Sequence, residues 1–266
     1  MTVTEENHSA LALPKLVSNG TLDWKAVAFL WLALERHRSI IVAAEPRLAG
    51  KTTLLHAMME LVAPIYSFVA TRGRKEDFGH LLDHCPKETY IVVNELSDHL
   101  ETYLWGPPVG MLFRLVARGY AFVATMHAEA PMGVVRELLA PQLTLSHADV
   151  ANVDLIVMLE LETESRELVR RVMSINTLEV TADESVSIVA TPLMVRKFSQ
   201  GSLEVVSGGL AWAVIARRLA LPESVVHEEI AARADLLPRL LQGEIVDSMS
   251  VRRVMEQHYR LHPPMQ

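Results

Sequence analysis

The sequence is poor in the residues that several classes of protein need. Cys85 is the only cysteine among 266 residues, which excludes intramolecular disulfides and cysteine-rich zinc sites and suits a reducing cytoplasm. Aromatic residues make up 6% of the chain, and the net charge is -7 without a basic stripe. An acidic chain of this kind is a poor binder of nucleic acids, so we expect no nucleic-acid partner.

Long apolar runs are also missing. The longest ones, such as residues 26–34, end in charge and are too short to cross a bilayer, so we expect no transmembrane segment. Residues 1–6 have no basic region ahead of an apolar run, so we expect no secretory signal. Because 50% of the residues are hydrophobic, the chain can bury a substantial core. These features predict a globular, cytoplasmic protein.

The most informative segment is residues 39–62. Residues 39–44, Ser-Ile-Ile-Val-Ala-Ala, predict a buried strand, and the apolar spacing of residues 52–62 predicts a helix. Between them, Gly50, Lys51 and Thr52 match the end of a Walker A phosphate loop. Loops of this kind wrap phosphates with backbone N–H groups and with the positive end of the helix dipole. The segment therefore predicts a nucleotide site, and its alternative is an ordinary turn with a surface lysine.

Each part of this loop has an expected role. Lys51 should reach the β- and γ-phosphates, and the Thr52 hydroxyl should ligate Mg²⁺. The predicted nucleotide-binding residues are Pro46, Arg47, Leu48, Ala49, Gly50, Lys51, Thr52 and Thr53. Glu45 stands where the motif has its first glycine, and its carboxylate would repel a polyphosphate unless it points outward.

Two further strands end in residues with suitable chemistry. Residues 89–95 predict a buried strand that delivers Glu95 beside the nucleotide, to hold the Mg²⁺ shell or to polarise the attacking water. Alternatively, Glu95 is the first exposed residue after the strand. Residues 120–126 predict another strand, followed by His127 at the edge where open α/β sheets bind ligands. No partner lies at ligand spacing from His127, so we expect no metal there.

The remaining segments predict the rest of the fold. Strands are expected at 65–70, 153–159 and 168–175, and helices at 21–36, 210–219, 223–241 and 251–259. Thr21 is expected to cap the first helix. The short acidic spacer 162–167 predicts a hairpin, and hence an antiparallel edge of the sheet.

The order of these segments resembles the motor core of the traffic ATPases that drive type II and type IV secretion and type IV pilus or archaellum assembly. Residues 91–96, Ile-Val-Val-Asn-Glu-Leu, are similar to the Walker B strand of that family. Residues 124–129, Ala-Thr-Met-His-Ala-Glu, resemble its histidine box and are the most diagnostic piece. Residues 16–22 look like its lead-in, and residues 227–237 look like the helical tail of its archaeal and tight-adherence branches.

The resemblance implies a RecA-like P-loop fold of the α/β class, with a mostly parallel sheet, an antiparallel edge hairpin and a small helical C-terminal subdomain. The implied division is a lead-in (1–20), a P-loop ATPase core (21–205) and the helical subdomain (206–266). ATP and Mg²⁺ are the implied ligands. Lys51, Glu95 and His127 are the implied catalytic residues, with Glu95 orienting the water and His127 reporting the γ-phosphate.

The resemblance also implies partners and a location. It predicts a homo-oligomer, a hexamer, that works with an inner-membrane secretion or pilus platform, in the cytoplasm or peripherally at the inner membrane. An arginine from a neighbouring subunit is expected to act in trans. The stretch between the two Walker motifs is shorter than the family usually has. Glu76 and Asp77 are its nearest match to the family's acidic box, with Arg72 or Arg74 standing in for the arginines.

Three functions follow from these features. The leading hypothesis is an ATP-hydrolysing motor subunit. The second is a nucleotide-binding pseudoenzyme that serves as an assembly or regulatory partner, which Glu45 and the reduced acidic box favour. The third is a small-molecule kinase or a DNA-associated motor, disfavoured by the histidine box and by the acidic charge.

Overall fold

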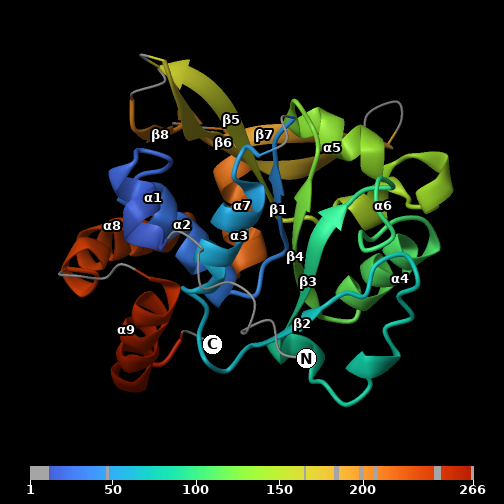
Figure 1. Cartoon of the computed structure of the whole chain (residues 1–266), viewed down its shortest axis with the longest axis horizontal. Coiled ribbons are helices and arrows are strands. Elements are labelled where there is room, and N and C mark those ends of the chain that lie inside the picture. Colours follow the sequence, from blue (N-terminus) through green and yellow to red (C-terminus); the bar gives the residue numbers. More distant parts are fainter. Residues whose placement is uncertain are drawn as a thin grey trace.

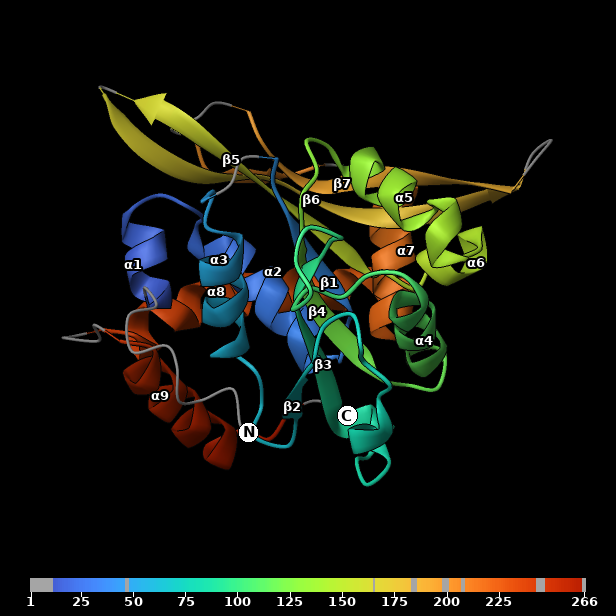
Figure 2. The same ribbon diagram turned by 45° about the vertical axis from the view of Figure 1, so that its right-hand side comes forward.

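The computed structural model describes residues 12–45, 48–164, 166–182, 186–197, 201–206, 209–242 and 247–264. Within them the chain forms one eight-stranded sheet with helices on both faces (Figures 1 and 2). The strands are β1 (Ile40–Ala43), β2 (Ser67–Ala70), β3 (Thr89–Leu96), β4 (Ala121–Met126), β5 (Leu155–Glu164), β6 (Glu167–Ala182), β7 (Val186–Arg196) and β8 (Leu203–Val205).

The strand order is β2-β3-β4-β1-β5-β6-β7-β8. Neighbouring strands run parallel from β2 to β5 and antiparallel from β5 to β8. The predicted α/β fold is thereby confirmed, with a parallel core and an antiparallel edge. In this order β4 separates β1, which leads into the phosphate loop, from β3, which carries Glu95.

The sheet divides the hydrophobic core into two clusters. Every residue of β1 is buried, and alternate residues face opposite clusters, as expected for a parallel strand covered on both faces. The first cluster includes helices α1 (Leu13–Ser18), α2 (Trp24–Glu35), α3 (Lys51–Met59), α7 (Leu210–Leu219), α8 (Glu223–Leu240) and α9 (Ser248–Leu261). The second includes α4 (Pro107–Val116), α5 (Pro131–Leu138) and α6 (His147–Val150).

The N-cap of helix α2 lies two residues after the predicted cap. Its N-cap is Asp23, whose carboxylate accepts a hydrogen bond of 2.9 Å from the Ala26 amide. The Thr21 carbonyl instead accepts the Val172 amide at 2.7 Å, which ties this residue to β6. The prediction of Thr21 as the cap is therefore wrong, because a long-range strand contact engages its backbone.

The C-terminal helices pack directly on α2. Arg233 of α8 forms a buried ion pair of 3.0 Å with Glu35, and Tyr259 of α9 hydrogen-bonds to Trp31. Helices α7, α8 and α9 thus share one core with α2 and α3. The predicted division into lead-in, core and helical subdomain stays a prediction.

The antiparallel edge is longer than predicted. β5 extends to Glu164 and β6 begins at Glu167, so most of the acidic spacer 162–167 belongs to the strands. β6 then pairs with β7, and β7 with β8, two strands that the sequence did not predict. Figure 2 shows the three long strands β5, β6 and β7 crossing the top of the molecule. Among the described residues, none of the helices combines the length and the hydropathy needed to span a bilayer.

Candidate functional site

The loop between β1 and α3 has its unusual backbone angles at Leu48 and Gly50. Gly50 caps α3 with a φ of 91°, and Leu48 has a φ of 64° and is 85% exposed as a residue. Glu45 is exposed and is not among the described residues with positive φ. Position 45 therefore does not need a glycine for its backbone, and its carboxylate is free to point into solvent. Pro46 and Arg47, both predicted to bind nucleotide, lie outside the described residues.

Strands β3 and β4 bring an acid and a histidine together at one end of the sheet. Glu95 is buried near the end of β3, and His127 directly follows β4. His127 Nε2 lies 3.0 Å from Glu95 Oε1, and His127 Nδ1 donates to the Glu45 carbonyl at 3.0 Å. The histidine therefore bridges the acid strand and the start of the loop. Glu95 Oε1 is buried and makes no hydrogen bond of good geometry to any residue that the structure describes.

Thr125 holds the other oxygen of Glu95. This fully buried residue of β4 donates its hydroxyl to the Asn94 carbonyl and lies 3.3 Å from Glu95 Oε2. Because one carboxylate oxygen is fixed in this way, the carboxylate has a defined orientation. The other oxygen, Oε1, lies against His127 Nε2, makes no hydrogen bond of good geometry to a described residue, and can therefore still accept from a water molecule or bind an ion.

Lys51 completes the cluster from the first turn of α3. Its side chain is buried, and Nζ lies 3.4 Å from each ring nitrogen of His127. Burial lowers the pKa of Lys51, and the negative charge of Glu95 opposes part of that decrease. A poorly hydrated ammonium at a helix N-terminus attracts an anion strongly.

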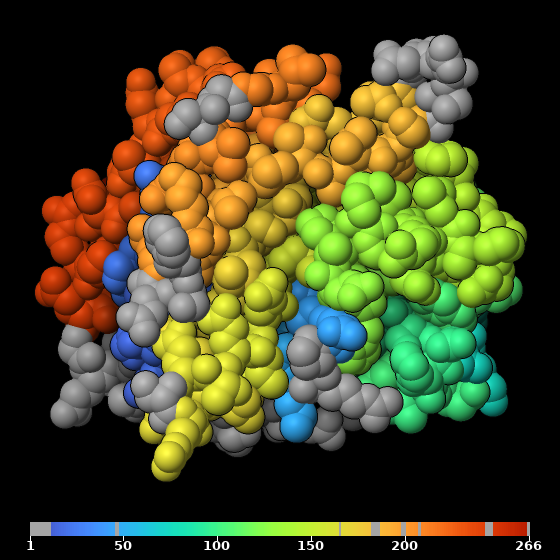
Figure 3. Space-filling view, turned by 90° about the horizontal axis from the view of Figure 1, so that it is seen from above, coloured from blue at the N-terminus to red at the C-terminus, as the bar shows by residue number. Residues whose placement is uncertain are grey.

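These groups line one cavity of about 1160 Å³. Six predicted loop residues line it together with both predicted strand residues: Leu48, Ala49, Gly50, Lys51, Thr52, Thr53, Glu95 and His127. The space-filling view shows light-blue atoms of the loop region in a furrow between the yellow β5–β6 hairpin and the green segment that follows β4 (Figure 3). The structure therefore brings together every predicted site residue that it describes.

The cavity suits a nucleotide and a magnesium ion. Its volume is large enough for a ligand of drug size, which needs about 300–1000 Å³. The start of α3 and Lys51 supply positive charge for phosphates, while the Thr52 hydroxyl and the Glu95 carboxylate supply oxygen atoms of the kind that Mg²⁺ prefers.

Further residues line this cavity that the sequence did not predict as site residues. Among them are His99, Tyr103 and Arg170. The His99 ring hydrogen-bonds to Ser97 and lies 6.1 Å from the His127 ring, measured between centroids. His99 and Tyr103 follow β3 in a stretch without a periodic pattern, so nothing in the sequence placed them. Arg170 lies in a strand that the sequence did predict, but the position of its side chain at the cavity depends on the register of the β5–β6 hairpin.

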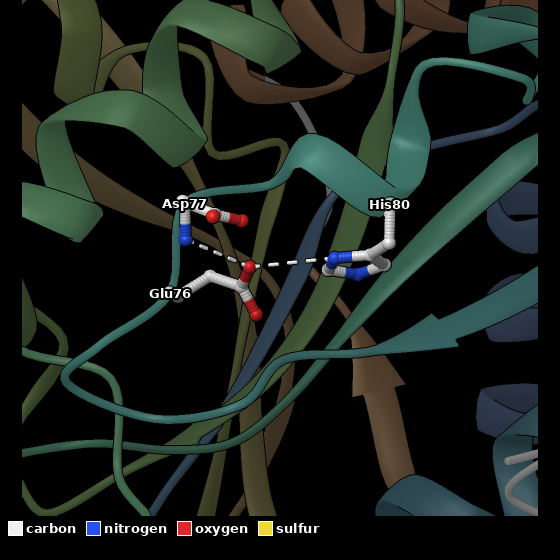
Figure 4. Close-up of side chains that lie close together, drawn as sticks. All are labelled: Glu76, Asp77 and His80. Carbon is white, nitrogen blue, oxygen red and sulfur yellow. Dashed lines mark hydrogen bonds and ion pairs between the residues drawn. The ribbon is translucent and has the colours of Figure 1, made fainter.

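The proposed acidic-box residues lie elsewhere. Glu76 is buried and accepts backbone N–H groups of Arg72 (2.6 Å), Asp77 (3.0 Å) and Phe78 (2.7 Å). Its Oε1 also lies 3.5 Å from His80 Nδ1, and Figure 4 shows the carboxylate pointing between Asp77 and the His80 ring. Neither acid is among the described residues that line the cavity. Glu76 instead organises its own turn, so the acidic-box assignment is not supported by the geometry.

The proposed stand-in arginines are equally remote from the cavity. Arg74 forms an ion pair of 3.4 Å with the exposed Glu101. Neither Arg72 nor Arg74 is among the described residues of the cavity lining.

No family model matches the chain. An uncharacterized protein of Methanocaldococcus jannaschii, MJ1287, is 22% identical over 267 residues, which cover 91% of this chain and 96% of that protein. A second uncharacterized protein of that organism, MJ0900, is 23% identical over 280 residues, which cover 94% of this chain. The chain spans only about half (49%) of MJ0900.

Two solved structures share part of the fold. The VirB11 ATPase of the Brucella suis type IV secretion system, in complex with sulphate, has a TM-score of 0.41 and 19% identity, over 60% of this chain and 53% of that one. The ATPase DotB of Legionella pneumophila has a TM-score of 0.31 and 12% identity, over 84% of this chain and 61% of that one. Similarities at this level do not by themselves assign a function.

Proposed function

We propose that the chain is an ATP-binding and ATP-hydrolysing subunit of the kind that powers type II or type IV secretion or type IV pilus assembly. One observation carries the ATPase part: Lys51, Glu95 and His127, from three separate segments, meet at the wall of one cavity beside a helix N-terminus. The secretion part depends on the order of the sequence motifs, chiefly residues 124–129.

Each residue has a task in this proposal. The loop amides and Lys51 bind the phosphates, and the Thr52 hydroxyl is the protein ligand of Mg²⁺. When bound, Mg²⁺ would neutralise charge on the phosphates. Glu95 orients the attacking water and takes up its proton through the buried Oε1. His127, fixed by the Glu45 carbonyl, contacts the γ-phosphate.

The proposal includes self-association. Three leucines at the mouth of the cavity are largely exposed: Leu48 (85%), Leu100 (52%) and Leu168 (62%). An apolar rim around a charged site favours a second copy of the chain as its cover. We therefore propose a homo-oligomer, a hexamer by resemblance, in which a neighbouring subunit supplies an arginine to the transition state. The partner in the cell would be a platform protein at the inner membrane.

The alternative is a nucleotide-binding pseudoenzyme that assembles or regulates a motor. Its specific support is Glu76, which three backbone N–H groups engage away from the cavity, so the nearest candidate for an acidic box is not available to the nucleotide.

The rate of phosphate release from Mg-ATP, measured against protein concentration, distinguishes the two. A motor shows turnover that rises with self-association and is lost in Lys51→Ala and Glu95→Gln. A pseudoenzyme binds ATP without turnover at any concentration. Lys75→Ala is a matched control, because this exposed lysine is not among the described residues of the cavity lining.

A further inference from the structure

Two successive arginines of β6 reach two different loops. Because neighbouring residues of a strand point to opposite faces, Arg170 and Arg171 diverge. Arg171 is buried, pairs with Glu164 at 3.3 Å and donates to the Asn19 carbonyl at 2.7 Å. Arg170 is exposed, and its Nε donates to the Leu48 carbonyl at 3.1 Å. Arg171 therefore ties β6 to the turn at Asn19, and Arg170 lies on the phosphate loop.

The contact between Arg170 and the loop is close. A Cβ placed on Gly50 would lie 2.9 Å from Arg170 Cδ and 3.4 Å from its Nε. The glycine at this position thus serves two purposes, since it adopts a φ of 91° and leaves room for the arginine stem. The β5–β6 hairpin brings Arg170 there from far along the chain, and the guanidinium lines the same cavity as Lys51.

The charge of Arg170 has no acidic partner in the part of the chain that the structure describes. Its hydrogen bond to the Leu48 carbonyl uses Nε, which leaves the two terminal nitrogens, Nη1 and Nη2, without a partner among the described residues. The guanidinium, the Lys51 ammonium and the start of α3 all present positive charge to one cavity. Glu95 and Glu167 also line the cavity, but neither forms an ion pair with Arg170 among the described residues. A planar guanidinium fits phosphate oxygens in a bidentate manner, so a phosphate is the anion that this side chain suits.

We propose that Arg170 binds the polyphosphate of the nucleotide within its own subunit, with Nε held by the Leu48 carbonyl and the terminal nitrogens directed at phosphate oxygens. This inference depends on the proposed function, because it requires a nucleotide on the loop. Arg170 would thus be a phosphate-binding arginine from the same subunit, in addition to the arginine expected from a neighbouring subunit.

Substitution by glutamine separates the two contacts of Arg170. The side-chain nitrogen of glutamine occupies the position of arginine Nε, so Arg170→Gln keeps a donor for the Leu48 carbonyl but removes the charge and the terminal nitrogens. Arg170→Ala removes both. Arg166→Ala is the matched control, since this exposed arginine of the same hairpin is not among the described residues of the cavity lining.

Isothermal titration of each variant with Mg-ATP and with AMP tests the proposal. We expect Arg170→Gln and Arg170→Ala to bind ATP about tenfold or more weakly, with AMP affinity much less affected. Arg166→Ala should match the wild type, and all variants should share its melting temperature.

Two results would overturn the inference while leaving the proposed function in place. One is wild-type ATP affinity in Arg170→Gln, and the other is an equal loss of ATP and AMP binding, which would indicate a purely structural role. A wild-type chain that binds no adenine nucleotide would overturn the proposed function, and the inference on Arg170 with it.

Discussion

His127 Nε2 lies 3.0 Å from Glu95 Oε1, and the two residues come from the ends of neighbouring parallel strands. The pair ties the acid that would activate water to the loop that would hold phosphate, because the same imidazole donates to the Glu45 carbonyl. A change at the phosphate loop can therefore reach the carboxylate through one side chain.

His127→Ala should impair hydrolysis more than binding. Loss of the imidazole removes the contacts to Glu95 and to the Glu45 carbonyl, while Lys51 and the loop amides remain. We expect turnover to fall on the order of 10²-fold, with ATP affinity changed only a few-fold. Steady-state phosphate release combined with a binding titration measures both. His147→Ala, an exposed histidine of α6, is the control. Unchanged turnover in His127→Ala would refute this role.

Glu45→Gly should leave nucleotide binding nearly unchanged. The Glu45 side chain is exposed, its backbone does not require positive φ, and its useful contact is made by its carbonyl. Removal of an exposed carboxylate near a polyphosphate should at most tighten binding slightly, since water screens the charge. Calorimetric titration with Mg-ATP checks this. A tenfold or greater gain in affinity would show that Glu45 degrades the site.

The strand-loop-helix unit could be predicted because its signals are local. A fully buried strand appears in the sequence as an unbroken apolar run. The Gly-Lys pair that follows it, just before a helix, is typical of a phosphate loop. The helix α7 was predicted to the residue, since its apolar positions repeat at helical spacing and Gly209 precedes it. The convergence of Glu95 and His127 followed from the common edge at which parallel strands end.

The rest depended on long-range pairing. Strand β7 contains Pro192, which weakens a strand prediction, and it exists because β6 is long enough to pair with it. Arg170 reaches Leu48 only through the register of the β5–β6 hairpin, in which it lies opposite Leu161. No local pattern encodes that register. The buried turn around Glu76 could likewise not be predicted from the sequence, because its carboxylate accepts hydrogen bonds from backbone amides, which every residue type offers.

Glu60, the C-cap of α3, should make stability depend on pH. Ser248 of α9 donates to one oxygen, and the other has no hydrogen-bond partner among the described residues. Burial raises the pKa of Glu60 from 4.5 to about 7. The folded state therefore retains a proton that the unfolded state releases between these values. The stabilisation is complete below about pH 4.5 and is lost as the pH rises through about 7.

The matched variant for this prediction is Glu60→Gln, which cannot ionise. Relative to it, the wild type should lose roughly 3 kcal/mol of unfolding free energy between acid and neutral pH. Urea titrations of both proteins across this range give the difference. The comparison cancels the contributions of other groups such as His37. Burial lowers the pKa of His37 to about 4, so its contribution to the free energy of unfolding changes with pH in the opposite direction. A difference that does not vary with pH would contradict the prediction.

Arg233→Ala should be strongly destabilising. Arg233 is buried, pairs with Glu35 at 3.0 Å and lies 4.4 Å from the Trp31 ring centroid, so its removal leaves a buried carboxylate without its cation. The expected loss of unfolding free energy is about 3–5 kcal/mol. Arg252→Ala, which breaks an exposed pair with Glu256, should cost about 0.5 kcal/mol or less. Chemical denaturation measures both, and equal effects would contradict the argument.

Calorimetric titration of the wild type and of Lys51→Ala with Mg-ATP is the most direct test of the central claim, that the loop, Lys51, Glu95 and His127 form one triphosphate site. Saturable binding is expected for the wild type and for Lys75→Ala, with affinity reduced about 10- to 100-fold in Lys51→Ala because a charged contact to phosphate is lost. Absence of heat with every adenine nucleotide, or equal affinity in Lys51→Ala, would contradict it.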